Sequence, residues 1–142
     1  MAMKLGIIAE PTVEDVRKTA EKGLSCVEYC YNVGRDVSLL EKSVPELLDA
    51  YREYGVSLGA LGRWGAFKID DEGKLVESEW ENTCRLIDVA AALGAPVFNT
   101  GVNYVDKLPY LVNIECAKAF LEKTVAYAAT KGVKVATVNC DW

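Results

Sequence analysis

One unit recurs four times along this chain and constrains its fold more than any other feature. In each copy, a segment with helical spacing of apolar residues ends at a glycine, and a short apolar run follows directly. The glycines are Gly23, Gly55, Gly94 and Gly132, which we expect to end their helices in the left-handed conformation. Another apolar run precedes the first helix. We therefore predict five strands alternating with four helices, the strands lying at residues 5–9, 24–29, 56–61, 97–100 and 133–138.

These strands show little polar alternation, which is typical of a parallel sheet covered by helices. Two folds fit the pattern: an open flavodoxin-like sheet with strand order 2-1-3-4-5, and the first half of a barrel with order 1-2-3-4-5. A flavodoxin-like domain would normally add a helix after the last strand, whereas this sequence stops at Trp142. We therefore predict an α/β fold with one domain over residues 1–142. It is a parallel (β/α)4-β unit, the N-terminal half of a TIM (β/α)8 barrel.

Composition excludes several classes of function. The net charge of -5 argues against a surface for duplex nucleic acid, which would need a basic stripe. No apolar run is long enough to span a membrane, and the opening residues do not resemble a secretory signal. Five cysteines at wide spacings, with no histidine, predict neither a zinc site nor a disulfide framework. We expect reduced, mostly buried thiols in a cytoplasmic protein that contacts neither nucleic acid nor membrane.

Local capping patterns predict where the helices begin. Thr12, followed by two acidic residues, is expected to cap the first helix. Capping-box patterns at 43–46 and 78–81 predict the starts of the second and third helices, and Asn113 is a candidate cap for the fourth. Two longer loops follow strands: residues 65–77, which read as a small hairpin, and residues 103–112. Both are expected at the C-terminal side of the sheet, where α/β proteins place their sites.

Several segments together resemble the sugar phosphate isomerase/epimerase proteins with a xylose isomerase-like TIM barrel. The segments that carry the resemblance are residues 3–8, 21–29, 47–56, 87–95 and 131–140. The resemblance covers nearly the whole chain and implies the N-terminal half of the barrel. It also implies isomerisation or epimerisation of a sugar or sugar phosphate, by proton transfer next to a carbonyl. Such proteins typically use a divalent metal (Mn, Mg, Zn or Co) held by carboxylates and a histidine at strand ends.

The resemblance also indicates which positions in this chain would hold the metal. In the family, the first metal carboxylate usually stands at the end of the fifth strand, directly before an asparagine. Asn139 matches that asparagine, but Val138 occupies the carboxylate position and has no oxygen to offer a hard cation. Asp141 is a weaker substitute, and the remaining ligands would come from later strands. We therefore expect no metal or other cofactor in this chain, and a divalent metal only in a longer parent protein.

Polar and aromatic side chains at the predicted strand ends are the candidate substrate contacts. They are Glu10, Glu28, Asn32, Arg63, Trp64, Asn99, Asn103 and Asn139. Glu28 interrupts an apolar strand and is either a substrate contact or a structural carboxylate paired with backbone or Arg63. Arg63 fits a phosphate or carboxylate clamp, or else a surface salt bridge. Trp64 fits a stacking platform or a hydrophobic lid. The asparagines suit sugar hydroxyls, although they also cap loops. No residue is assigned a catalytic role.

Three functions remain open at this stage. The first is a sugar isomerase or epimerase-like protein that binds a small-molecule sugar and is incomplete as a catalyst at this length. The second is a non-catalytic half-barrel that assembles through its open strand edges, which predicts a homo-oligomer. The third is a flavodoxin-like domain that binds a small ligand. Strand order separates the third from the other two.

Overall fold

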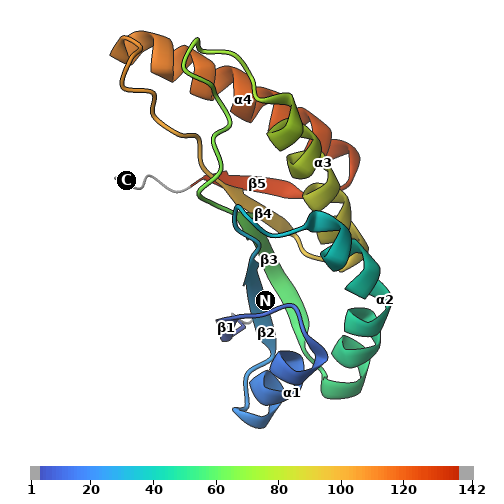
Figure 1. Cartoon of the computed structure of the whole chain (residues 1–142). Helices are drawn as coiled ribbons and strands as arrows, with labels where there is room; N and C mark the ends of the chain where they lie inside the picture. The colour runs from blue at the N-terminus through green and yellow to red at the C-terminus, as the bar shows by residue number, and fades with distance from the viewer. Residues whose placement is uncertain (1–3, 138–142) are drawn as a thin grey trace.

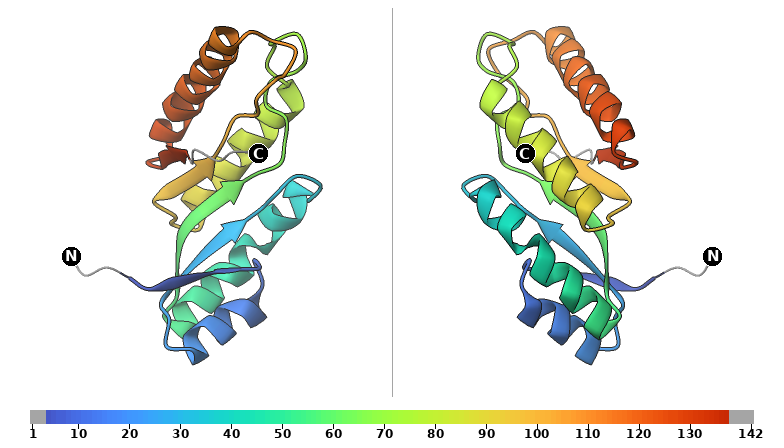
Figure 2. Two further views of the ribbon diagram at one scale, coloured as in Figure 1. Left: turned by 90° about the vertical axis from the view of Figure 1, so that its left-hand side faces the viewer. Right: turned by 90° about the vertical axis from the view of Figure 1, so that its right-hand side faces the viewer.

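The computed structural model describes residues 4–137 and contains five strands and four helices in strict alternation. The strands are β1 (Gly6–Ala9), β2 (Cys26–Cys30), β3 (Ser57–Arg63), β4 (Val97–Thr100) and β5 (Lys134–Thr137). The helices are α1 (Val13–Glu21), α2 (Val37–Tyr54), α3 (Glu77–Ala92) and α4 (Tyr110–Thr130). All four helices lie along one side of a curved sheet, and no helix within residues 4–137 covers its other side (Figures 1 and 2).

The sheet settles the choice between the two folds. Its strands are all parallel and stand in the order β1-β2-β3-β4-β5. A flavodoxin-like domain would have β1 between β2 and β3, so that alternative is wrong for this chain. Sequential order in a curved parallel sheet with helices on the outside is the arrangement of a half-barrel. The prediction of a (β/α)4-β half-barrel is confirmed.

Side chains alternate between the two faces of the sheet. Val27, Tyr29, Leu61 and Phe98 point toward the helices and are at most 1% exposed. They form the main core with apolar residues of α2 and α3, and Tyr51 of α2 donates a 2.8 Å hydrogen bond to the Tyr29 hydroxyl within it. The intervening residues of the same strands point away from the helices. We call that side the open face; it carries Ile8, Cys26, Glu28, Cys30, Ala60, Gly62, Val97 and Asn99.

Some helix boundaries follow the local sequence. Thr12 caps α1, and its hydroxyl accepts a 3.2 Å hydrogen bond from the Asp15 amide, as predicted. The glycines at the four helix-strand junctions all have positive φ, between 67° and 76°. A side chain there would be strained, whereas glycine reverses the chain at low cost.

Three predicted helix starts are wrong. Helix α2 begins at Val37, capped by Asp36, so Pro45 lies inside the helix and the Ser43 hydroxyl donates back to the Leu40 carbonyl. The earlier start buries Val37 and Leu40 in the core. Burial of the helix face therefore outweighs the capping-box pattern at 43–46.

The third and fourth helices also begin before their predicted caps. Helix α3 starts at Glu77, directly after Val76 closes the preceding hairpin by donating to the Lys68 carbonyl. Helix α4 starts at Tyr110, and Asn113 lies buried in its first turn. The Asn113 amide exchanges hydrogen bonds with the backbone of Val105, at 2.8 and 3.1 Å. In both cases a contact with the preceding loop decides where the helix begins.

The two long loops form a second, smaller core at one end of the sheet. Residues 65–77 contain the predicted hairpin, marked by an antiparallel bridge between Ile69 and Leu75. Ile69 packs with Val105 of the next loop and Phe120 of α4. These loops follow β3 and β4, so they lie at the C-terminal ends of the strands, as expected.

Two further expectations concern cysteines and membranes. Cys26, Cys30, Cys84 and Cys116 are free thiols, as predicted, but all are half-buried rather than mostly buried. Cys26 and Cys30 are exposed in part because none of the four described helices covers the open face (Figure 2). Within residues 4–137 no helix is long and apolar enough to cross a membrane.

Candidate functional site

A carboxylate and an amide meet on the open face. Asn99 of β4 donates a 2.6 Å hydrogen bond from its side-chain nitrogen to Oε1 of Glu28 on β2. Both side chains are half-buried. Glu28 is thus partnered by another of the predicted site residues, and the Arg63 pairing considered from sequence is wrong. The second carboxylate oxygen and the Asn99 carbonyl oxygen remain hydrogen-bond acceptors for a ligand.

Small residues on the intervening strand make this contact possible. Glu28 and Asn99 lie two strands apart, about 9.5 Å across the sheet, so their side chains must reach over β3. The β3 residues in register with them are Ala60, beside Glu28, and Gly62, beside Asn99. A longer side chain at either position would separate the carboxylate from the amide.

Trp64 lies beside this pair. A Cβ atom added to Gly62 would stand 3.0 Å from the Trp64 ring nitrogen and 3.4 Å from the Asn99 Cβ. The indole therefore folds back from the end of β3 over Gly62, on the same face as Asn99. Its cover explains why Gly62 is buried although it belongs to the open face. Trp64 itself is half-buried.

Acidic groups surround the ends of β1 and β2. Glu10 follows β1, is exposed, and pairs with Arg35 at 2.7 Å. Arg35 also stands over the Tyr31 ring, with 4.4 Å between the guanidinium carbon and the ring centroid. Burial, together with the carboxylates of Glu28 and Glu10, raises the pKa of the Cys30 thiol. Cys30 therefore stays protonated near neutral pH and is a poor nucleophile there.

Arg63 occupies the opposite face from the Glu28–Asn99 pair. Its side chain is 3% exposed and forms two hydrogen bonds with the Glu79 carboxylate of α3, at 2.9 and 2.7 Å. It also donates to the backbone carbonyls of Tyr31 and Asn32, at 3.2 Å each. The salt bridge is thus buried rather than on the surface. Arg63 holds the ends of β2 and β3 to the first turn of α3.

Lys68 joins the same buried ion-pair cluster and was not singled out from the sequence. Its side chain is 1% exposed, and its ammonium lies 3.8 Å from Glu79. Burial lowers the Lys68 pKa to about 8, against the opposing effect of the Glu79 charge. Burial tends to raise the Glu79 pKa, but hydrogen bonds from Arg63 and Asn82 outweigh it and lower that pKa. The only sequence signal for Lys68 is its position between Phe67 and Ile69 in an apolar stretch.

The remaining asparagine candidates differ in their positions. The Asn103 side chain accepts hydrogen bonds from the backbone amides of Lys68 and Ile69 and donates to the Ile69 carbonyl, so it connects the two long loops. Asn32 has an exposed side chain beyond β2. Asn139, like Val138 and Asp141, lies outside the described residues. The structure therefore brings Glu28, Trp64 and Asn99 together, with Glu10 at the neighbouring strand end.

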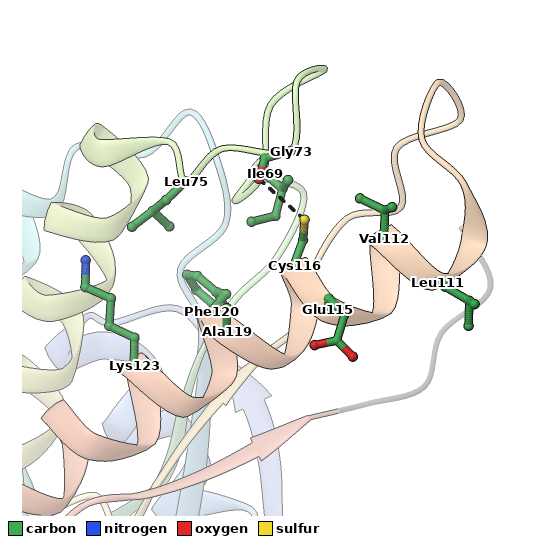
Figure 3. Close-up of a pocket in the computed structure, with 10 residues that line it drawn as sticks. All are labelled: Ile69, Gly73, Leu75, Leu111, Val112, Glu115, Cys116, Ala119, Phe120 and Lys123. Carbon is green, nitrogen blue, oxygen red and sulfur yellow. Dashed lines mark hydrogen bonds between the residues drawn. The ribbon is translucent and has the colours of Figure 1, made fainter.

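Two hollows in the described part of the chain are candidate ligand sites. One of about 220 Å³ lies on the open face between β1, β2 and β3, and Glu28 is among its lining residues. The other, of about 500 Å³, lies between the hairpin and α4 (Figure 3). Its lining is mostly apolar, with Cys116 directed at the Gly73 carbonyl at 3.4 Å. Among residues 4–137, Glu28 is the one candidate residue in the wall of the first hollow, whereas Asn99 and Trp64 lie beyond it toward the C-terminal ends of the strands.

The metal that the family resemblance implies does not fit the described residues. No three histidine, cysteine, aspartate or glutamate side chains between residues 4 and 137 come close enough together to hold a metal ion. Glu28 provides one carboxylate, and its closest polar partner is an amide. A hard divalent cation prefers about six or more oxygen ligands, and one carboxylate beside an amide supplies too few of them. We therefore derive no metal-dependent step from this part of the chain.

Comparison with known structures shows the same half-barrel in larger proteins. A D-allulose 3-epimerase from Methylomonas sp. matches with a TM-score of 0.73 and 20% identity, over 95% of this chain and 50% of that chain. A D-psicose 3-epimerase from Clostridium cellulolyticum H10 matches with a TM-score of 0.71 and 14% identity, over 94% and 51%. An AP endonuclease, family 2, from Brucella melitensis matches with a TM-score of 0.70 and 13% identity, over 95% and 55%.

This chain therefore spans about half the length of those proteins. At such identities the likeness concerns the fold alone. A comparison with curated protein sequences gave no match. Residues 16–142 match the family model described as xylose isomerase-like TIM barrel. The chain belongs to the xylose isomerase-like TIM barrel family.

Proposed function

We propose that the C-terminal end of the open face binds a sugar, as part of the substrate site of a sugar isomerase or epimerase. The observation that carries this proposal is the Glu28–Asn99 pair beside the Trp64 indole. A sugar offers hydroxyl groups in many directions and apolar C–H groups between them. A site for it needs convergent hydrogen-bonding groups and an apolar wall, and this end of the sheet offers both.

Each residue has a defined part in this proposal. The free carboxylate oxygen of Glu28 and the carbonyl oxygen of Asn99 accept hydrogen bonds from sugar hydroxyls. The hydrogen bond between the two side chains fixes their orientation before the ligand arrives, which reduces the ordering cost of binding. The Trp64 indole excludes water on one side. Arg63 and Asn103 hold the surrounding loops through their backbone contacts.

Proton transfer next to a carbonyl requires an acid–base group within hydrogen-bond distance of the substrate carbon. Within residues 4–137, Glu28 is the carboxylate that lines the hollow of the open face. We propose that Glu28 orients the sugar and that the remaining catalytic groups, with any divalent metal, belong to a longer parent protein. The 142-residue chain is then a sugar-binding half without turnover.

The proposal is tested by measuring sugar binding to the 142-residue chain. Saturation-transfer NMR with D-allulose, D-fructose and D-tagatose, sugars named with related structures, should detect a complex. Asn99→Ala should weaken binding about 5- to 10-fold, because about 1 kcal/mol is lost with the amide. Asp49→Ala, an exposed position on α2, is the matched control and should bind as the unaltered chain does. No transfer to any of the three sugars would contradict the proposal.

Exposed apolar side chains at the edge of the sheet favour a second candidate, which we also propose for the chain by itself. Leu5 is 72% exposed and Ile8 of β1 is 64% exposed, and β1 and β5 have free edges in the described sheet. Exposed strand edges favour pairing with another chain. Size-exclusion chromatography with light scattering should then show a homo-oligomer. A monomer at high micromolar concentration would contradict this candidate and leave the sugar-binding proposal intact.

The other expectations remain proposals. The net charge of -5 supports a protein that does not bind duplex nucleic acid. The endonuclease name of one neighbour therefore describes that neighbour only. A cytoplasmic location and a role in carbohydrate metabolism are consistent with free cysteines and with the sugar site proposed above.

A further inference from the structure

Helix α4 carries exposed apolar side chains on one side. The helix ends the row of four and packs against α3 and β5 (Figure 1). Phe120 and Tyr127 contact α3, where their rings meet the Trp80 ring edge to face. Ile114 and Val125 lie on a different side of α4 and are 46% and 50% exposed. A hollow of about 630 Å³ borders them, so within residues 4–137 no other element covers this side of the helix.

Four residues on this side repeat with the spacing of a coiled-coil seam. Ile114, Lys118, Leu121 and Val125 follow one another at intervals of four, three and four residues, and Leu111 precedes them by three. This spacing aligns the side chains in one line along the helix, the pattern with which two helices pack against each other. We call Ile114, Lys118, Leu121 and Val125 the α4 stripe. An exposed apolar line of this kind favours contact with another helix.

The charges at the α4 stripe indicate which helix it fits. Residues 1–3 and 138–142, which lie outside the described range, are too few to cover a helix of 21 residues. Lys118, and Glu122 beside the stripe, are exposed, and neither has an ion-pair partner within residues 4–137. The two charges stand about one turn apart near the middle of α4. A partner that presents the same charges in reverse order satisfies both, and another copy of this chain is such a partner.

We propose that the α4 stripe binds the α4 stripe of a second copy of this chain, with the two helices antiparallel. The two-fold axis passes near Ala119, at the middle of α4. Ile114 then packs against Val125 of the second copy, and Lys118 lies over Leu121 of the second copy with its ammonium beside Glu122. The inference is independent of the proposed sugar site. It concerns the homo-oligomer of the second candidate function but assigns it to α4 instead of the strand edges.

The charge of Lys118 selects the antiparallel orientation. In a parallel pair, each Lys118 would lie beside the other Lys118 and each Glu122 beside the other Glu122, and both contacts repel. In the antiparallel pair, each lysine meets a glutamate. A single lysine in an otherwise apolar seam is known to fix the register of paired helices at some cost in affinity. One helix pair also gives an interface at the small end of the usual range, so we expect a dissociation constant of about 10–100 µM.

The test is a charge-swap cycle read by sedimentation equilibrium of the 142-residue chain, from about 1 to 500 µM. Lys118→Glu and Glu122→Lys should each raise the dissociation constant about 10-fold, because each places like charges together across the two-fold axis. The double variant Lys118→Glu/Glu122→Lys should return it to within about 3-fold of the unaltered chain, since the attraction is restored with its signs exchanged.

A matched control separates local pairing from net charge. Lys42→Glu, at an exposed position on α2, changes the net charge by the same amount as Lys118→Glu. It should leave the dissociation constant within about 2-fold, because distant exposed charges are screened by salt. Circular dichroism of each variant checks that the helices remain folded.

The outcomes separate this inference from the proposals above. A monomer throughout the concentration range overturns it together with the strand-edge candidate, leaves a further helix of a longer parent protein as the occupant of the α4 stripe, and does not affect the sugar site. A dimer that Lys118→Glu leaves unchanged overturns this inference alone, and the strand edges remain the interface. A dimer weakened by both single variants but not restored by the double variant contradicts the antiparallel pairing.

Discussion

The two faces of the sheet differ in how far their side chains are buried and in what those side chains contact. On the helix-covered face, Tyr29 and Phe98 are fully buried and every strand contributes to a common core. On the open face, their chain neighbours Glu28 and Asn99 are half-buried and bond to each other across an intervening strand. Because parallel strands alternate their side chains, adjacent residues serve different purposes. The helix-covered face stabilises the fold, and we propose that the open face presents the Glu28 and Asn99 side chains to a ligand.

The largest expected effect contrasts two adjacent residues of β4. Phe98→Ala should lower the free energy of unfolding by about 3–5 kcal/mol, because it leaves a cavity in the main core. Asn99→Ala should lower it by less than about 1 kcal/mol, since the side chain is half-exposed and water can replace its hydrogen bond. Urea denaturation followed by circular dichroism measures both. Similar losses in the two variants would contradict the division between faces.

The buried cluster at the end of the strands should be nearly as sensitive. Glu79→Gln removes the negative charge that compensates Arg63 and Lys68, and we expect a loss of about 3 kcal/mol in unfolding free energy. The matched control is Glu81→Gln, an exposed position in the same helix, which should change stability by less than about 0.5 kcal/mol. Equal effects at the two positions would show that the cluster does not hold the loops.

Lys68 should give the protein a distinctive pH dependence. Its pKa is lowered to about 8 in the folded chain from an ordinary value of 10.5. Between these values the unfolded chain binds more protons, so the Lys68 contribution to stability rises with pH from about 8 to 10.5. Relative to Lys68→Met, the unaltered chain should therefore gain stability between pH 7.5 and about 9.5. A constant difference across that range, in denaturation at several pH values, would contradict the lowered pKa.

A smaller effect is expected within the core. Tyr51→Phe removes the hydrogen bond to the Tyr29 hydroxyl and should cost about 1 kcal/mol. Burial raises the pKa of Tyr29 to about 12, so the tyrosine contribution is present below pH 10 and is lost as pH rises further. Tyr110→Phe, at an exposed position, is the control and should leave the denaturation midpoint unchanged. Equal denaturation midpoints for Tyr51→Phe and Tyr110→Phe would show that this hydrogen bond does not stabilise the folded chain.

The sequence predicted the strands and the glycine helix ends, because these depend on local pattern. The strand order was correctly predicted as well, but local pattern alone fitted two orders. The sequence misplaced three helix starts because burial of Val37 and Leu40 decides where α2 begins, and loop contacts of Val76 and Asn113 decide where α3 and α4 begin. No local sequence pattern contains these contacts. Glu28 and Trp64 stood out as polar or aromatic residues at strand ends. The partner of Glu28 could not be read from the sequence, since Asn99 is 71 positions away and reaches it only across small residues of β3.

The contacts of Arg63 and Lys68 also could not be predicted from the sequence. Arg63 was a candidate site residue because of its charge. The alternation of side chains along β3, however, directs Arg63 toward the helices, where it pairs with Glu79. A bulge between β2 and β3, after Val27, shifts the register and makes that parity hard to count from sequence. Lys68 and Glu79 lie in a loop and a helix turn that only the folded chain brings together.

The central claim is that the C-terminal end of the open face binds a sugar. Titrating isotope-labelled chain with D-allulose and recording backbone and side-chain amide shifts tests it most directly. The account predicts saturable shifts for the Asn99 side-chain amide, the Trp64 indole N–H and the Glu28 amide, with little change in α1 and α2. The absence of saturable shifts at those groups, or shifts confined to the apolar hollow between the hairpin and α4, would contradict it.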